Sequence, residues 1–302
     1  MLSGAFILDN KKNVQYKYFY SKSFAKIGVP TVVFSILYIL YRIPLCLMGE
    51  DKLLELLKDI LRGSPMAHMW YLYMLIGIYA LSPVIIRFKE SITEKMFYKI
   101  SCVFLILASV SRWAGTVGLN WDIGQSFEYL GYFMTGYSIR KIFTGKNSNG
   151  KAFISILAGI ILEMCAAGLE YKQMIDGIQE TDLKYRIVAP YCPLIVPASV
   201  CIFIGFALLN VKKEYADMSD ITFYIYLIHA GVWDFMGQVF CAGLGRDFIT
   251  GLNGEIWIPV FVIVVFGVSC ALSKLYLWTW GKLDKERRIT NYLLKIVRLQ
   301  TD

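Results

Sequence analysis

The feature that most constrains this chain is a series of long apolar blocks separated by short charged segments. Apolar residues make up 57% of the chain, and its mean hydropathy is +0.52. A helix needs roughly 20 mostly apolar residues to cross the hydrocarbon core of a bilayer, because backbone amides there can pair only with one another. The blocks therefore predict an all-α, polytopic bundle of about eight transmembrane helices. The expected spans cover residues 27–45, 66–86, 100–119, 123–140, 152–171, 187–210, 219–240 and 256–280.

The basic residues indicate how such a bundle is oriented. Lys and Arg collect in alternate connecting segments, and the C-terminal segment belongs to the richer set. By the positive-inside rule this set faces the cytoplasm, so residues 281–302 are expected to form a cytoplasmic tail of a multi-pass cell-membrane protein. The net charge of +8 then reflects orientation and contact with anionic lipid, and no nucleic-acid partner is expected. No linker or composition shift divides the chain, which predicts a single membrane domain over residues 1–302.

Cysteines and histidines do not form a metal-binding pattern. The seven cysteines fall mostly inside expected spans without a CxxC pair, so we interpret them as packing residues. The two histidines, His68 and His229, are far apart in the sequence. We therefore expect no metal site.

The first eight residues are apolar but too short to cross a bilayer. Met1–Leu8 runs directly into a basic segment that is expected to be cytoplasmic, so the octet is predicted to be the inner end of a helix that descends from outside. A short anchor at the membrane surface is the alternative.

Ionisable residues inside spans are functional candidates, because burying a charge in the membrane is costly. They are Arg42, Arg112, Glu128, Glu163, His229, Asp234 and Lys274. Together with His68 and Trp70 at the outer end of a span, Glu163 and His229 are predicted to line a hydrated cavity open to the outside. Ion pairs that join helices, a hydrogen-bonded packing histidine and an interfacial aromatic belt are the competing interpretations.

Lys22 and Lys26 lie four residues apart, on one helical face at the inner membrane edge. Ammonium groups are good point-charge partners for phosphate, so these lysines are candidates for binding a charged cytoplasmic donor. Positive-inside anchoring is the alternative interpretation.

With these residues identified, the chain resembles the integral-membrane acyltransferase family 3. Four segments carry the resemblance, and a fifth, EYLGYFMTGYSI, supports them. They are MLSGAFIL, YSKSFAKIGVP, HMWYLYMLIGIYALSPVI and DITFYIYLIHAGV, in the family's order. The resemblance implies ten helices, so two would precede or overlap Met1–Leu8, with that octet a remnant of the second.

The resemblance also implies an activity. Family members move an acyl group, commonly acetyl, from a cytoplasmic CoA thioester to a hydroxyl, often of an extracytoplasmic glycan, so the cofactor would be acyl-CoA and the process polysaccharide modification of the cell envelope. It implies donor binding by Lys22 and Lys26, although Ser23 and Lys26 stand where arginines are expected. The family's catalytic histidine would precede Met1, which leaves the catalytic residue of this chain unassigned.

Two other functions fit a polytopic chain with buried charges. One is a transporter or flippase-like carrier of a small anion or glycan, and the other is a non-catalytic membrane partner that keeps the fold. No Gly/Pro-broken pair of helices or inverted repeat supports the carrier. For an enzyme, a glycan, a lipid-linked sugar and a small metabolite are all compatible acceptors, and the number of subunits is open.

Overall fold

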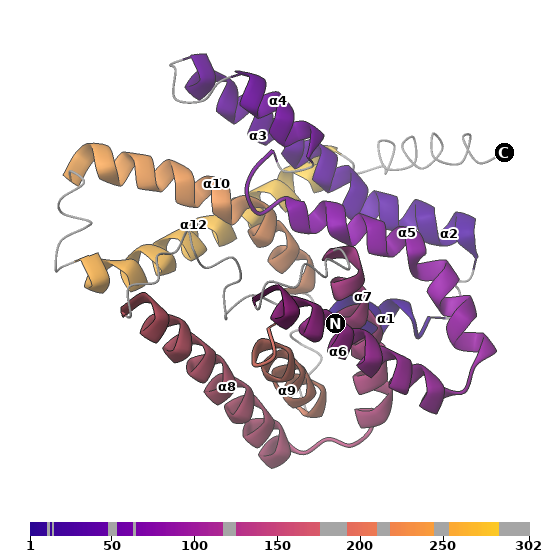
Figure 1. Cartoon of the computed structure of the whole chain (residues 1–302). Coiled ribbons are helices and arrows are strands. Elements are labelled where there is room, and N and C mark those ends of the chain that lie inside the picture. Colours follow the sequence, from indigo (N-terminus) through magenta and orange to yellow (C-terminus); the bar gives the residue numbers. More distant parts are fainter. Residues whose placement is uncertain are drawn as a thin grey trace. The chain divides into compact units, whose positions relative to one another are not determined.

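A computed structural model of the whole chain describes residues 1–10, 13, 15–47, 53–62, 65–116, 125–175, 192–209, 218–244 and 254–283. In these ranges the regular elements are helices and no strand occurs, which confirms the all-α prediction (Figure 1). They are α1 (Leu2–Ile7), α2 (Tyr16–Ser23), the π-helical turn η2 (Phe24–Gly28), α3 (Val29–Leu47), α4 (Leu53–Leu61), α5 (Trp70–Ser91), α6 (Glu94–Thr116), α7 (Gln125–Phe143), α8 (Asn149–Ile175), α9 (Ile195–Leu208), α10 (Met218–Leu244) and α12 (Gly254–Leu283).

Each expected span falls on one of these helices, but fewer of the helices have the length and hydropathy of a membrane span. Among the described residues, four helices are long and apolar enough to cross: Tyr16–Pro44, Trp70–Ser91, Asn149–Gln173 and Pro259–Thr279. The first joins α2, η2 and α3 in one continuous helix. These four confirm that the chain is built for a bilayer, whereas the count of about eight spans stays a prediction.

Buried hydroxyl groups show how polar residues are tolerated inside these apolar helices. Ser82 donates to the Ile78 carbonyl at 2.9 Å, and Ser269 and Ser273 each donate at 2.7 Å to the carbonyl four residues earlier. A hydroxyl satisfied by its own helix needs no water, so it can lie in a hydrocarbon environment.

The chain divides into two compact units, and each is described by itself. Unit 1 contains Met1–Phe19 and Gly77–Val211, and unit 2 contains Tyr20–Ile76 and Lys212–Asp302. Two of the three boundaries between the units fall inside helices, one in α2 and one in α5. The single membrane domain expected over residues 1–302 stays a prediction.

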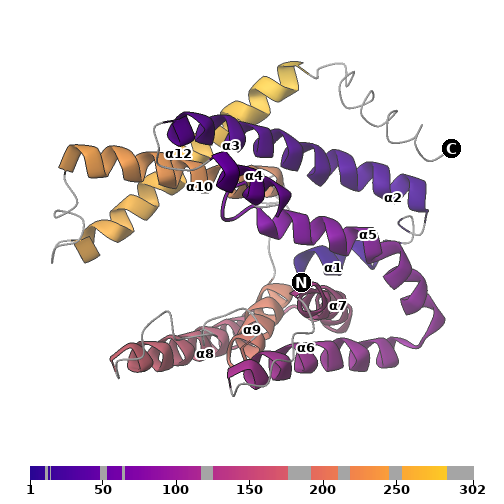
Figure 2. The same ribbon diagram turned by 45° about the horizontal axis from the view of Figure 1, so that its top comes forward.

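Glycines set the helix packing of unit 1. A Cβ at Gly4 of α1 would overlap the Phe133 carbonyl of α7, and a Cβ at Gly136 of α7 would overlap the Met1 carbonyl. The two backbones therefore touch directly. Helices α8 and α9 also lie side by side (Figure 2). A Cβ added at Gly159 would lie only 2.8 Å from the Ala198 carbonyl oxygen. This is the close packing of small residues that is typical of membrane helices.

Two cations hold the C-terminal end of α1. The Arg140 guanidinium donates to the Ala5 carbonyl at 2.8 Å and lies 4.3 Å from the centre of the Phe6 ring. Lys89 donates to the Leu8 carbonyl. Cations at a helix C-terminus complement its exposed carbonyls and its dipole. Ala5 and Leu8 are buried, so the octet is a helix packed into unit 1.

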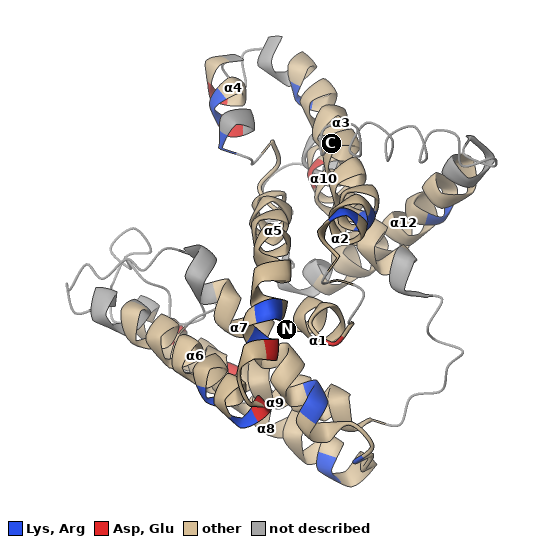
Figure 3. Cartoon of the chain, turned by 90° about the vertical axis from the view of Figure 1, so that its right-hand side faces the viewer, with Lys and Arg blue, Asp and Glu red and all other residues tan. Residues whose placement is uncertain are grey.

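The core of unit 2 joins α3, the start of α5, and α10. Its buried residues are Phe34, Tyr38, Met69, Leu72 and Leu227. Helix α4 is held to α3 by an ion pair between Arg42 and Asp59 at 2.9 Å. In Figure 3 α5 is uncharged except near its C-terminal end, whereas the short helices α2 and α4 carry charged residues.

Candidate active site

A cluster of histidine and tyrosine rings lies at the polar edge of the unit 2 core. The ring centres of His68 and His229 are 5.2 Å apart, and the Tyr38 and Tyr226 rings lie 5.5 and 5.4 Å from that of His68. We call these four residues the two-histidine site. They come from α3 (Tyr38), the segment before α5 (His68) and α10 (Tyr226 and His229).

Tyr38 fixes the turn of α10 that carries His229. Its hydroxyl donates to the Leu227 carbonyl at 2.6 Å and accepts from the Gly231 amide at 3.3 Å. These two backbone groups are the pair that one rung of an α-helix joins. The close approach requires glycine at 231, because a Cβ there would lie 2.9 Å from the Tyr38 ring.

His229 has a defined tautomer. Its Nδ1 lies 2.7 Å from the Tyr226 carbonyl, which can only accept a hydrogen bond. Nδ1 therefore carries the proton in the neutral ring, and Nε2 carries a lone pair. Such a nitrogen can take a proton from a nearby hydroxyl.

His68 has two ring nitrogens that are both buried and without a hydrogen-bond partner among the described residues. Burial is the main cause that lowers the pKa of His68 from 6.5 to about 4; the neighbouring His229 contributes in the same direction and the Leu227 carbonyl in the opposite one. That carbonyl receives its hydrogen bond from Tyr38 rather than from the imidazole. His68 precedes the candidate span Trp70–Ser91 and is therefore neutral near pH 7.

A second polar group follows one turn further along α3 and α10. The Tyr41 hydroxyl donates to the Asp234 carboxylate at 2.8 Å, and Gln238 donates to the same oxygen at 3.3 Å. Asp234 was expected as an ionisable residue inside a span, and a phenol and an amide satisfy its carboxylate here. The Tyr41 hydroxyl thereby links α3 to α10 at this level.

The structure brings together only some of the residues that the sequence predicts for the site. His68 and His229 meet, and Trp70 follows His68 by two residues, with its ring 6.2 Å from that of Tyr71. Lys22 and Lys26 are exposed on α2 and η2, in the same continuous helix as Tyr38. Glu163 is exposed on α8 in unit 1, so its cavity-lining role stays a prediction. The side chains of Arg112 and Glu128 lie outside the described residues.

Sequence reasoning missed Tyr38 and Gly231. Tyr38 lies in an apolar block where a tyrosine is indistinguishable from a packing residue, and Gly231 is one of 24 glycines. The only signal available was the position of Gly231 two residues after a histidine.

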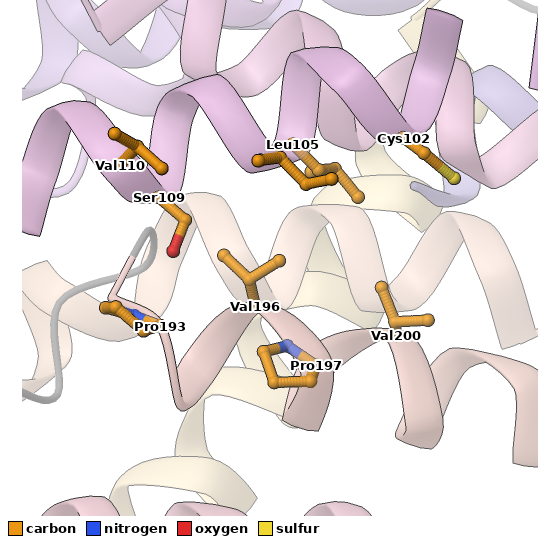
Figure 4. A pocket seen from close by; sticks show the side chains of 9 residues that line it. Cys102, Leu105, Ser109, Val110, Pro193, Val196, Pro197 and Val200 are labelled. Carbon is orange, nitrogen blue, oxygen red and sulfur yellow. The ribbon is translucent and has the colours of Figure 1, made fainter. Parts of the chain in front are cut away.

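Unit 1 contains a groove of different character. It lies between α6 and α9 and has a volume of about 580 Å³ (Figure 4). Apart from Cys102 and Ser109, aliphatic side chains such as Leu105, Val196 and Val200 line it. Such a surface can contact an apolar chain but has no group that can accept a proton near neutral pH, so we place the candidate chemistry at the two-histidine site.

The comparison with known families agrees with this architecture. The helices and the half-buried pair of imidazole rings define a multi-pass membrane protein with a candidate site for proton transfer. The family model described as Acyltransferase domain, that of acyltransferase family 3, matches residues 1–274, and the chain therefore belongs to this family. No curated protein and no solved structure matches it significantly.

Proposed function

We propose that this protein is a membrane O-acyltransferase. It moves an acyl group, most simply acetyl, from a cytoplasmic CoA thioester to a hydroxyl of an extracytoplasmic glycan in the cell envelope. Membership of the acyltransferase family supports the reaction class. The observation that carries the proposal is that one continuous helix, Tyr16–Pro44, bears both the candidate donor-binding lysines and Tyr38 of the two-histidine site.

The spacing along this helix suits a CoA thioester. Tyr38 follows Lys26 by twelve residues, which corresponds to about 18 Å at a helical rise of 1.5 Å per residue. That distance is comparable with the extended pantetheine arm between the CoA phosphates and the sulfur. Phosphates bound at the lysines would thus present the thioester near His68 and His229.

The exposed lysines at the basic end of the helix support donor binding there. Lys22 and Lys26 are exposed, and Lys26 lies in the π-helical turn η2. Single π-helical turns within longer helices occur frequently at functional sites, because the extra residue redirects the side chains around it. Two ammonium groups there can bind phosphate as point charges.

Removing both charges is expected to weaken CoA binding. In the double variant Lys22→Gln, Lys26→Gln, we expect the Kd for CoA to rise about tenfold, which corresponds to about 1.4 kcal/mol of lost charge-assisted hydrogen bonding. Isothermal titration of CoA into the purified protein in detergent measures this. The Lys22→Arg, Lys26→Arg variant keeps both charges and is the matched control, with affinity at least equal to that of the wild type. An unchanged Kd in the glutamine variant would contradict donor binding at these lysines.

Loss of the gene from cells that naturally make the protein tests the reaction itself. We expect alkali-labile, ester-linked acetate on the envelope glycans to disappear and to return when the gene is restored on a plasmid. Membranes of the restored cells should also transfer label from radiolabelled acetyl-CoA to those glycans. Unchanged ester-linked acetate in the deletion strain would refute the proposed function.

A further inference from the structure

We propose that Trp233, Asp234 and Gln238 form a sugar-binding subsite in unit 2, which takes a neutral or amino sugar and disfavours an acidic one. We call these three residues the sugar subsite. It lies on α10 at the end remote from Lys22 and Lys26, which the positive-inside rule predicts to be outside. The inference rests on the proposed transfer to a glycan and names the residues that would hold that glycan.

Contacts with neighbouring helices place the sugar subsite near the edge of the expected membrane. The Asp234 carboxylate accepts a hydrogen bond from Tyr41, which lies three residues before the end of the candidate span Tyr16–Pro44. The Trp233 ring lies 4.8 Å from that of Phe261, near the start of the last candidate span. A sugar attached to a lipid or to an envelope polymer can reach this level without entering the hydrocarbon.

The polar groups of the sugar subsite keep hydrogen-bonding capacity for a ligand. Oδ2 of Asp234 accepts from the Tyr41 hydroxyl at 2.8 Å and from Gln238 at 3.3 Å. Oδ1 of Asp234 and Oε1 of Gln238 have no hydrogen-bond partner among the described residues. Gln238 is exposed and Asp234 is half-buried. These two oxygens can therefore accept hydrogen bonds from sugar hydroxyls, while Tyr41 holds the carboxylate in position.

An exposed indole lies beside these polar groups. The Trp233 side chain is 48% exposed. Its ring contacts the Phe261 ring in a T-shaped arrangement, with an interplanar angle of 78°, and such a contact covers at most one face of the indole. The electron-rich face of an aromatic ring attracts the C–H groups on the apolar face of a pyranose ring. Trp233 can thus act as the stacking platform of the subsite.

Gly237 leaves room for a sugar ring between the indole and the carboxylate. Successive residues of an α-helix are turned by about 100°, so Gly237 projects between Trp233 and Asp234, one turn further along the axis. No described atom lies within 4 Å of a Cβ added at Gly237. A pyranose ring over this glycine would have the indole on one side and Asp234 and Gln238 on the other.

The charge of Asp234 determines which sugars fit. No Lys or Arg among the described residues forms an ion pair with Asp234, and Arg42, next to Tyr41 on α3, is paired with Asp59 at 2.9 Å. A carboxylate attracts the ammonium group of an amino sugar and accepts from the hydroxyls of a neutral one. It repels the carboxylate of a uronic acid, which suppresses acidic sugars as partners.

Saturation-transfer NMR measures the binding of sugars directly. The purified wild type, in phosphatidylcholine nanodiscs without any sugar-containing detergent, is mixed at slightly acidic pH with one of three trisaccharides. They are neutral chitotriose, the cationic glucosamine trimer and the anionic galacturonic acid trimer. We expect saturation transfer to the first two, and a Kd at least about threefold higher for the galacturonic acid trimer, since a partly exposed charge contributes modestly. Empty nanodiscs give the background.

Two variants test the space and the charge of the subsite separately. Leucine in Gly237→Leu occupies the place of the sugar ring, so saturation transfer to all three trimers should fall to background. Gly267→Leu on α12 is the matched control and should bind as the wild type does, because no described atom lies within 4 Å of a Cβ added there either. Asp234→Asn keeps an acceptor for the Tyr41 hydroxyl but loses the charge. Chitotriose should therefore still bind, and the difference between the two charged trimers should disappear.

The inference is overturned by wild-type signals at background for all three trimers, by undiminished binding in Gly237→Leu, or by an unchanged preference in Asp234→Asn. The last of these decides the case if Gly237→Leu loses stability. Each result leaves the proposed acyl transfer standing, because ester-linked acetate in the deletion strain tests it separately. Sugar binding by the wild type combined with unchanged ester-linked acetate in that strain would support the subsite and refute the proposed function.

Discussion

Replacing Gly136 with leucine is expected to separate α1 from α7. A Cβ at this position would overlap the Met1 carbonyl, and backbone atoms cannot turn aside as a flexible side chain can. Overpacking of this kind costs typically 1–3 kcal/mol, and the rigid neighbour places Gly136→Leu at about 3 kcal/mol or above. Hydrogen exchange measures the effect. We expect the amides of residues 2–8 to lose their protection against exchange, while the amides in the rest of unit 1 stay protected.

Gly168→Leu provides the matched control for this change. Gly168 lies on α8, and nothing lies within 4 Å of a Cβ added there. Leucine is the better helix former by roughly 0.8–1 kcal/mol, so this variant should be neutral or slightly stabilised. Equal protection of residues 2–8 in the Gly136 and Gly168 variants would show that the contact between α1 and α7 is not close.

Replacing His68 with phenylalanine is expected to stabilise the protein while abolishing acyl transfer. Phenylalanine can keep the edge-on contacts with Tyr38 and Tyr226 and removes two buried nitrogens that have no partner in the described residues. Relieving unsatisfied buried polar atoms is worth about 1–3 kcal/mol. We expect a higher melting temperature in detergent and transfer to envelope glycan close to background. A lower melting temperature with normal transfer would show that His68 is a packing residue.

The same variant is expected to change the pH dependence of stability. The pKa of His68 is lowered from 6.5 to about 4 in the folded chain, so between these values the unfolded chain binds a proton that the folded chain does not. Wild-type stability should therefore fall as the pH decreases from 6.5 toward 4. The groups that face His68 are Tyr38, Tyr226 and His229. In His68→Phe, the decrease in melting temperature between pH 6.5 and pH 4 should be smaller than in the wild type by the contribution of His68.

Much of the fold follows from the sequence because the bilayer imposes one simple rule. Long apolar blocks must be helices, and each expected span lies on one. The structure confirms long membrane-type helices in four cases among the described residues. Boundaries and the total count depend on side-chain exposure and on connecting segments, which hydropathy does not determine.

The candidate site was less predictable, because it depends on contacts between distant segments. His68 and His229 could be singled out as polar residues near apolar spans, but their proximity depends on how α3, α5 and α10 pack. Glu163 has an exposed side chain on α8, and its cavity-lining role stays a prediction. Tyr38 and Gly231 hold α3 against the turn of α10 that carries His229, and neither has a distinctive sequence signature.

The bridge from Tyr38 to α10 has a consequence for how the protein could respond to its donor. The hydroxyl of a residue on α3 shares the backbone groups of Leu227 and Gly231, and His229 lies between those two residues. A shift of α3 along its axis would therefore strain that turn of α10 and rotate the imidazole. Because the other end of the same continuous helix carries Lys22 and Lys26, occupation of the basic end and the orientation of the His229 ring become linked equilibria.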